Sequence, residues 1–105
     1  MKMGNARMKH KKAVEVLSAL AQESRLSIYL LLLEVGEDGL PAGEIAKKLD
    51  ISDTTLSFHL AQLKSAKLIR SHKEGRYVIY AANMRRAKKL SKLITGRNGG
   101  DEKRL

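Results

Sequence analysis

Apolar side chains recur every three or four positions in the first half of the chain and predict three helices. Residues 9–21 carry one apolar face, formed by Val14, Leu17, Leu20 and Ala21, which is typical of a half-buried helix. Residues 24–35 are apolar nearly all round, so we expect this helix at the centre of the core, where a small monomer could hardly bury all of it. After a break at residues 36–39, the pattern predicts a short helix over residues 42–49.

A fourth helix is expected to begin at Ser52, which is a good N-cap. Leu56, Leu60 and Leu63 lie at positions i, i+4 and i+7 and direct one apolar stripe towards the core. Residues 54–63 contain no formally charged side chain, whereas a solvated surface helix more often carries Glu and Lys there. Their hydroxyl, amide and imidazole groups can donate or accept hydrogen bonds at base edges. With the short helix before it, this helix predicts a helix-turn-helix that reads DNA.

The last third of the chain predicts a β-hairpin and a final helix. Residues 68–82 read as strand, tight turn and strand, with the turn at Glu74-Gly75, where glycine supplies the positive φ that such hairpins need. Asn83 can cap a helix over residues 84–94. The fold class expected is mainly α with a small β-hairpin, a winged helix-turn-helix in the order α-α-α-α-β-β-α.

Length and charge fit one small DNA-binding domain. We expect a flexible basic N-terminus over residues 1–8, a winged helix-turn-helix DNA-binding and dimerisation domain over residues 9–95, and a disordered tail over residues 96–105. The 105 residues include 21 Lys and Arg against 11 Asp and Glu, so the net charge is +10 and favours a polyanionic partner. Charge alone also fits ribosomal proteins and solubilising tails.

The chemistry of enzymes and metal sites is missing from the sequence. Cysteine is absent, which excludes disulfides, zinc–thiolate sites and thiol redox chemistry. His10, His59 and His72 fall on three different elements, with no acidic residue at metal-ligand or relay spacing. We therefore expect no catalytic residue, no metal and no cofactor, and a protein that is not an enzyme.

No segment predicts insertion into a membrane. The start of the chain superficially resembles a signal peptide, but Glu15 interrupts a run that is already short. The longest apolar run, residues 28–33, is far below the roughly 20 residues that a membrane span needs. We expect a cytoplasmic protein without a membrane partner.

The expected DNA contacts lie on the fourth helix and the hairpin, which we interpret as a wing. Short polar groups are assigned to base reading: Thr55, Ser57, His59 and Gln62. Arg76 at the wing tip is expected in or beside a minor groove. His59 fits either a bond to DNA or packing against the wing, and Phe58 fits either a thymine methyl or a neighbouring groove. The full set of predicted DNA-binding residues is Thr54, Thr55, Ser57, Phe58, His59, Gln62, Lys64, Lys67, Arg70, Lys73 and Arg76.

With four helices, a β-hairpin and a last helix expected in this order, residues 13–94 resemble the ArsR/SmtB family of winged-helix repressors. ALAQESRLSIYLLL is similar to the family's opening segment, GEIAKKLDISDTTLSFHLAQLKSAKLI to its helix-turn-helix, and KEGRYVIYAAN to its wing. The resemblance implies a homodimer on double-stranded DNA, bound to an imperfect palindrome near its own promoter and released by an effector. It also implies that the first and last helices form the dimer, with the contacts Val14, Leu17, Leu20, Ala87, Leu90 and Ile94.

The sensing sites of the family are where this chain departs from the resemblance. Thiolate sensors place two cysteines at positions near Pro41 and Gly43, and last-helix sensors need carboxylate and histidine ligands where this chain has Asn83 and Arg85. We therefore expect no sensing of metals, arsenite or thiol oxidants. An effector, where one exists, is an organic molecule or anion near the dimer helices, or a partner protein.

Three other functions fit the same pattern. The first is a constitutive repressor or architectural factor that has no effector. The second is a winged-helix module used for protein contact, which would lack a sequence-specific DNA site. The third is a winged helix that binds RNA, although nothing in the sequence resembles an RNA-binding aromatic pair.

Overall fold

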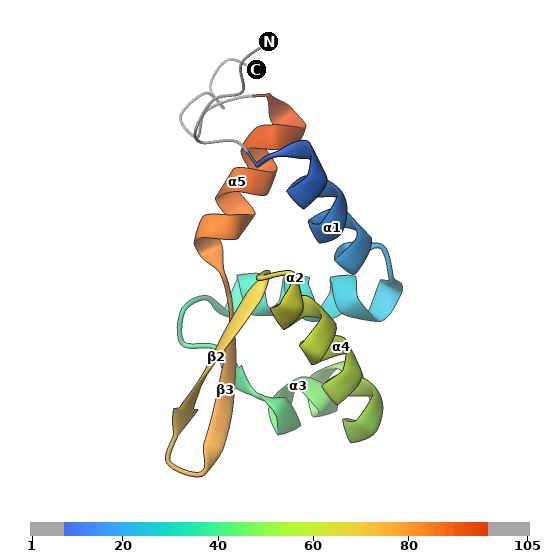
Figure 1. The fold of residues 1–105 in the computed structure, drawn as a ribbon. Coiled ribbons are helices and arrows are strands. Elements are labelled where there is room, and N and C mark those ends of the chain that lie inside the picture. Colours follow the sequence, from blue (N-terminus) through green and yellow to red (C-terminus); the bar gives the residue numbers. More distant parts are fainter. Residues whose placement is uncertain (1–7, 97–105) are drawn as a thin grey trace.

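The computed structural model describes residues 8–96, which form helices around a small antiparallel sheet (Figure 1). The predicted class is confirmed: the chain is mainly α, with a helix-turn-helix followed by a wing. In chain order the elements are α1 (His10–Leu20), α2 (Glu23–Val35), β1 (Leu40–Pro41), α3 (Ala42–Leu49), α4 (Asp53–Ser65), β2 (Ile69–Glu74), β3 (Tyr77–Ala82) and α5 (Met84–Thr95).

Met8, one residue before the domain start that we predicted, packs into the core. We placed Met8 in the flexible N-terminus, but its side chain is only 4% exposed and belongs to the hydrophobic core. A thioether on an unbranched side chain adapts readily to an irregular gap in a core. The flexibility expected of residues 1–7 and 97–105 concerns parts of the chain that lie outside the described residues.

The core is built mainly from α2, α4 and the residues that follow α4. The predicted leucine stripe of α4 is confirmed, because Leu56, Leu60 and Leu63 are all at most 4% exposed. Helix α2 is apolar all round, and its Leu26 and Leu30 remain exposed, as expected for a helix too apolar for one small protomer to cover. The largest fully buried side chains are Ile28, Leu32, Ile45, Leu56, Leu63, Leu68 and Val16.

Helix α1 faces the core with a different side from the one predicted. The sequence favoured a face with Val14 and Leu17, but the residues that the structure buries are Ala13 and Val16. Because the helix carries apolar residues on two neighbouring sides, periodicity alone could not decide which side packs inward. Val14 and Leu17 are left exposed instead.

The sheet differs from the prediction in its turn and in an extra strand. Glu74 pairs with Tyr77, so the two turn residues are Gly75 and Arg76, and Gly75 has the left-handed φ of 62° that the first position of such a turn favours. The two-residue strand β1 adds to the outer edge of β3. It approaches so closely that a Cβ at Gly39 would collide with the Tyr80 carbonyl oxygen.

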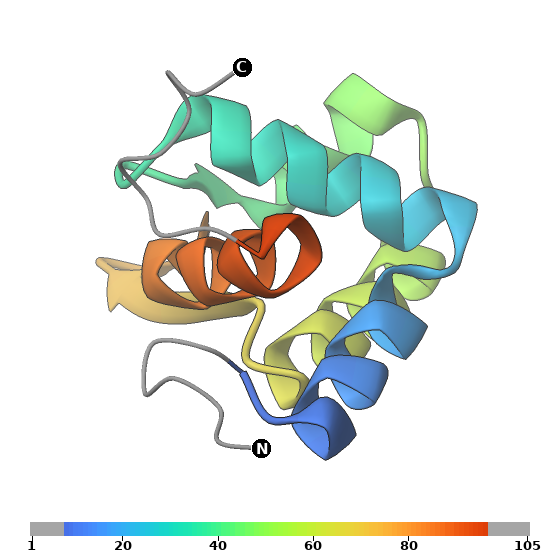
Figure 2. The same ribbon diagram turned by 90° about the horizontal axis from the view of Figure 1, so that it is seen from above.

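The two ends of the molecule hold different elements. Figure 1 shows α5 at one end with α1 leaning towards it, and the wing tip, α3 and the start of α4 at the other. Figure 2 looks down on the end that holds α5, which projects between α2 and the hairpin, while α1 projects over α4, with which it is in contact. Within residues 8–96, no single helix is long and apolar enough to cross a membrane, and α1 with α2 would reach that length only as a pair bent by 101°.

Candidate nucleic-acid interface

The turn between α3 and α4 positions the start of α4. Asp50 ends α3 in a left-handed conformation, with φ 55°, and the N–H of Ile51 donates to the Ala46 carbonyl at 3.0 Å. Ser52 then caps α4, since its Oγ accepts from the Thr55 N–H at 3.3 Å. This geometry leaves three residues between the helices, and it confirms the predicted helix-turn-helix and its N-cap.

The first half of α4 presents a face of small polar groups and one phenyl ring. Thr54, Thr55, Ser57 and Phe58 are all exposed, and Phe58 is 58% exposed. The Thr55 hydroxyl accepts from Ser52 Oγ at 3.0 Å, which leaves its own hydrogen free to donate. The structure thus brings these four predicted contacts together at the same end of the molecule as the wing tip (Figure 1). We call this group the reading face.

Two other predicted contacts on α4 lie on its flanks. Lys64 lines a hollow of about 250 Å³ between α4 and the wing, which Tyr80 of β3 closes. Gln62 lies on the opposite flank, where it lines a hollow together with residues of α1. Gln62 is exposed and lies two helical turns after Thr55 on the same side of α4, at the end of that side nearest α1.

The basic residues of the wing fall on both of its faces. Lys73 shares a face with Tyr80, which packs towards α4, because strand residues two apart point the same way and Ser71 pairs with Tyr80. Arg70 lies on the other face, so the structure does not bring it to the side of α4. Arg76 is exposed in the turn, as predicted for the wing tip.

Lys67 lies between α4 and β2 rather than on the wing. It has a left-handed φ of 61°, and its carbonyl accepts from the Asn83 side chain at 2.9 Å. Asn83 also caps α5, because its Oδ1 accepts from the Arg86 N–H at 3.2 Å, which confirms the predicted cap. The exposed Lys67 side chain is thus placed near the base of the wing, away from its tip.

His59 is a correction to the predicted DNA-binding set. Its side chain is only 7% exposed, and Nδ1 lies 3.4 Å from Nη1 of Arg25, which is in α2. A guanidinium can only donate, so Nδ1 accepts and the imidazole proton is assigned to Nε2. Burial lowers the pKa of His59, and the Arg25 charge lowers it further. The imidazole is therefore neutral at neutral pH, and its burial beside Arg25 leaves little of it accessible to DNA.

The sequence contained a signal for this position. His59 lies three residues after Leu56 and four before Leu63, so it belongs to the inward stripe. Arg25 is the partner that sequence reasoning missed. Its Nε donates to the Ala19 carbonyl in the last turn of α1 at 2.6 Å, so one guanidinium joins α1, α2 and α4.

The predicted dimer contacts divide into exposed and buried groups. Leu90 is 8% exposed, while Leu20 and Ala87 are half buried, and all three pack into the core of their own chain. Val14, Leu17 and Ile94 are 63%, 43% and 65% exposed, which leaves a broken apolar surface on α1 and α5. We call these three residues the exposed apolar group.

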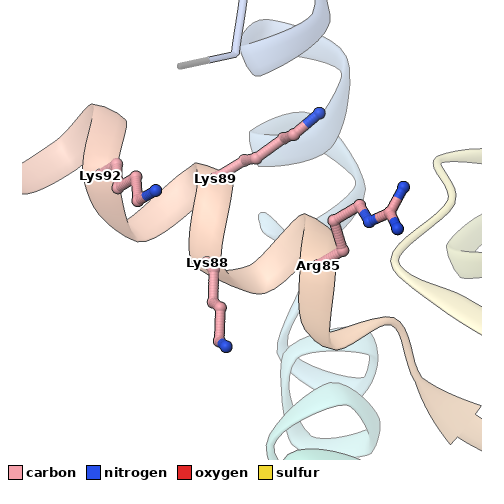
Figure 3. A pocket seen from close by; sticks show the side chains of 4 residues that line it. All are labelled: Arg85, Lys88, Lys89 and Lys92. Atoms are coloured by element: carbon pink, nitrogen blue, oxygen red, sulfur yellow. The ribbon is translucent and has the colours of Figure 1, made fainter. Parts of the chain in front are cut away.

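Helix α5 also carries a row of cationic side chains, which we call the α5 basic row. Its members recur at i, i+3, i+4 and i+7 and line a hollow of about 330 Å³: Arg85, Lys88, Lys89 and Lys92. Figure 3 shows that Lys88 points away from Arg85 and Lys89, so the charges do not converge on one point. No carboxylate within residues 8–96 forms an ion pair with any of them.

Metal ligands do not gather in the described part of the chain. Across residues 8–96, no group of three or more His, Cys, Asp or Glu side chains could hold a metal ion. The prediction that the protein does not sense metals stays a prediction.

Known proteins resemble this chain in sequence and in fold. A family model described as a helix-turn-helix domain matches residues 20–72. The transcriptional activator HlyU of Vibrio cholerae is 36% identical over 83 residues, which cover 79% of this chain and 74% of that protein. A putative arsenical resistance operon repressor, ArsR, of Halobacterium salinarum is 42% identical over 72 residues, covering 69% of this chain and 55% of that protein.

A solved structure extends the likeness to the fold. It is the homodimeric winged helix-turn-helix DNA-binding domain of Mb0332 from Mycobacterium bovis, with a TM-score of 0.65 and 29% sequence identity over 82% of this chain and 80% of that one. This chain thus spans about three quarters of the length of HlyU and just over half that of the Halobacterium protein.

Proposed function

The chain belongs to the ArsR/SmtB family of winged helix-turn-helix transcriptional regulators, and from this premise we propose that it is a dimeric repressor that binds a palindromic operator. Since members of the family are DNA-binding regulators, the chain is one as well, and the prediction that it is not an enzyme is confirmed. The dimer, the operator and the residues that read it belong to the proposal.

The observation that carries the proposal is the reading face. Thr54, Ser57 and Phe58 are exposed on the first half of α4, at the end of the molecule where the wing tip also lies (Figure 1). Short hydroxyl side chains can approach base edges in a major groove, and a phenyl ring can contact a thymine methyl. Lys64, Lys73 and Arg76 are cations on α4 and the wing that can contact the adjacent phosphates.

The exposed apolar group supports a dimer. Leu17 of α1 and Ile94 of α5 are large apolar side chains that the protomer leaves exposed, and α1 and α5 lie away from the reading face, where a partner can cover them. The Mb0332 domain, which has the same fold, is homodimeric. A two-fold dimer through α1 and α5 would direct both α4 helices to the same side, where they can enter major grooves about 34 Å apart.

The effector is proposed to be neither a metal nor a thiol oxidant. Cysteine is absent from the sequence, so the thiolate chemistry that binds arsenite or responds to oxidants cannot arise within the chain. Relatives are named both as an activator and as a repressor. We favour repression because a dimer bound across a promoter excludes polymerase.

Selection from a pool of random duplex DNA tests the proposal. The selected sequences should be inverted repeats with half-sites about 10 base pairs apart from centre to centre. Affinity for them should fall steeply with salt, by about one unit of logarithmic slope for each phosphate contacted. A pool that shows no enrichment would contradict a sequence-specific regulator and favour a module for protein contact.

A further inference from the structure

A hollow of about 490 Å³ lies between α1, the start of α2 and the second half of α4. We propose that this hollow, the α1–α4 pocket, binds a small organic monocarboxylate, and that the bound molecule shifts α4 relative to α1. Only the second part rests on the proposed function. Residues from three elements line the pocket, among them Val14, Glu15, Ser18, Arg25, Gln62 and Ser65.

Arg25 is the group that would hold the carboxylate. A guanidinium has five N–H donors, and the bonds to the Ala19 carbonyl and to His59 Nδ1 occupy two of them. Three donors remain, and no carboxylate within residues 8–96 forms an ion pair with Arg25. Because guanidinium groups bind carboxylates through two parallel N–H bonds, a planar carboxylate matches the donors that remain.

The rest of the lining restricts the ligand to a small molecule with one negative charge. Ser18, Gln62 and Ser65 offer uncharged donors and acceptors, and Val14 offers an apolar wall. Glu15 brings a negative charge to the pocket, although Lys12 pairs with it at 3.1 Å. A dianionic phosphate would therefore meet one cation and one carboxylate, which disfavours it. The volume is within the range of about 300–1,000 Å³ that small-molecule sites occupy.

The hollow on the α5 basic row is a weaker candidate, although it carries more charge. Its lining comes from one helix alone, and its side chains diverge (Figure 3). Without a second wall and without uncharged polar groups, it can attract polyanions but cannot fix the orientation of a small ligand. The α1–α4 pocket has both features.

The position of Arg25 explains how a ligand would act on DNA binding. Its guanidinium joins Ala19, in the helix expected to form the dimer, to His59, in the helix expected to read DNA. A carboxylate that draws the guanidinium into the pocket lengthens the 3.4 Å contact with Nδ1 of His59. The buried imidazole then loses its donor, and α4 can move against α1. The arrangement with the Arg25–His59 contact and the arrangement without it differ in their contacts with the ligand, as a ligand-driven shift requires.

The first experiment measures binding in the absence of DNA. The full chain, labelled with ¹⁵N, is titrated with the monocarboxylates acetate, propionate, butyrate and benzoate while its NMR spectrum is recorded. We expect at least one of them to shift the Arg25 Nε–H and the amides of Ser18 and Gln62 in a saturable way, with a dissociation constant of about 1 mM or lower. Shifts that do not saturate, or that concentrate on the α5 basic row, would overturn the site.

Replacement of Arg25 could unfold the chain, because its guanidinium joins three helices. A variant that fills the pocket tests the site without changing Arg25. Ser65→Leu adds an apolar side chain at an exposed position that lines the pocket, and it should weaken binding by about tenfold or more. Ala61→Leu also adds an apolar side chain at an exposed position of α4, but on the wing side and outside the predicted DNA contacts, and it should leave carboxylate binding unchanged. Equal losses in both variants would count against the pocket.

The second experiment adds the carboxylate that binds best to the complex with selected DNA. Wild-type affinity for DNA should change by about threefold or more, and the Ser65→Leu variant should not respond. A ligand that saturates the pocket and leaves DNA affinity unchanged would overturn the coupling while retaining the site. Failure to bind DNA at all would overturn the proposed function and would leave the NMR result standing.

Discussion

The helix-turn-helix and the pair formed by α1 and α5 differ in how they cover their apolar side chains. Leu56, Leu60 and Leu63 of α4 are all buried by their own chain. Leu17 of α1 and Ile94 of α5 are 43% and 65% exposed in the same protomer. The leucine stripe of the helix-turn-helix, which we call the reading half, is therefore covered within one chain, and its exposed apolar side chain on α4 is Phe58. Helices α1 and α5 instead leave Leu17 and Ile94 for a partner to cover.

The two halves also differ in charge. Residues 54–63 of α4 contain no formally charged side chain, whereas α5 carries five Lys and Arg and no acid. Uncharged hydroxyls can distinguish one base pair from another, but a row of cations attracts any polyanion. We infer that the uncharged face of α4 supplies specificity, while the α5 basic row adds non-specific attraction to that of the cations on α4 and the wing.

The largest effect should come from breaking the core of the reading half. Leu60→Ala should lower the free energy of unfolding by about 2–5 kcal/mol, because it removes buried methyl groups and leaves a cavity. Leu17→Ala, at a side chain that its own chain leaves 43% exposed, should cost the protomer much less. Urea unfolding at low protein concentration measures both, and equal losses would show that α1 is as buried as α4.

The second effect tests whether the exposed apolar group forms the dimer interface. Leu17→Glu should weaken dimerisation by at least about tenfold, because a carboxylate without a partner is costly to bury at an interface. Leu30→Glu is the matched control, since Leu30 is 54% exposed on α2 and lies outside the predicted dimer contacts. Sedimentation equilibrium provides the measurement. A larger loss for Leu30→Glu than for Leu17→Glu would move the interface to α2.

The third effect tests whether the reading face supplies specificity. Phe58→Ala should reduce the preference for the selected DNA over random DNA by about tenfold, since one base contact is worth about 1–3 kcal/mol. Arg76→Ala should weaken binding to both DNAs alike and lower the salt slope by about one. Gln62→Ala should keep the preference, because the structure places Gln62 beside α1. A lost preference in Gln62→Ala alone would reverse these assignments.

The smallest effect depends on pH and reports the environment of His59. Because the pKa of folded His59 is lowered, the unfolded chain takes up a proton below about pH 6.5 that the folded chain does not. The free energy of unfolding should therefore fall by up to about 1 kcal/mol between pH 7.5 and pH 5.5. His59→Gln should lose this dependence, while His72→Gln, at an exposed position, should keep it. Identical profiles in all three proteins would contradict a buried, neutral His59.

The local features were predicted from the sequence, and the tertiary ones were not. The leucine stripe of α4 and the caps at Ser52 and Asn83 depend on residues within two helical turns, so the pattern alone identified them. The role of Arg25 depends on Ala19 and His59, which only the packing of three helices brings together. The strand β1 is two residues long and therefore has no periodicity to detect.

Polar residues produced the main error at the site. His59 was assigned to the DNA side as a polar group on the flank of the leucine stripe, although its spacing from Leu56 and Leu63 placed it on the inward stripe. A buried polar group needs a partner, and the sequence does not show that Arg25 provides one. The sequence also did not show that Gln62 lies beside α1, which only the packing of the helices reveals.

Directed cleavage of DNA tests most directly whether the reading face enters the major groove. The sequence has no cysteine, so a single one can be introduced by Thr54→Cys, and a second variant, Ser91→Cys, places it on the exposed side of α5. Each is labelled with an iron chelate that cleaves nearby DNA. The label at position 54 should cut the selected DNA at two places about one helical turn apart, and the label at position 91 should not cut it. Equal cleavage from both positions, or cleavage from position 91 alone, would contradict the account.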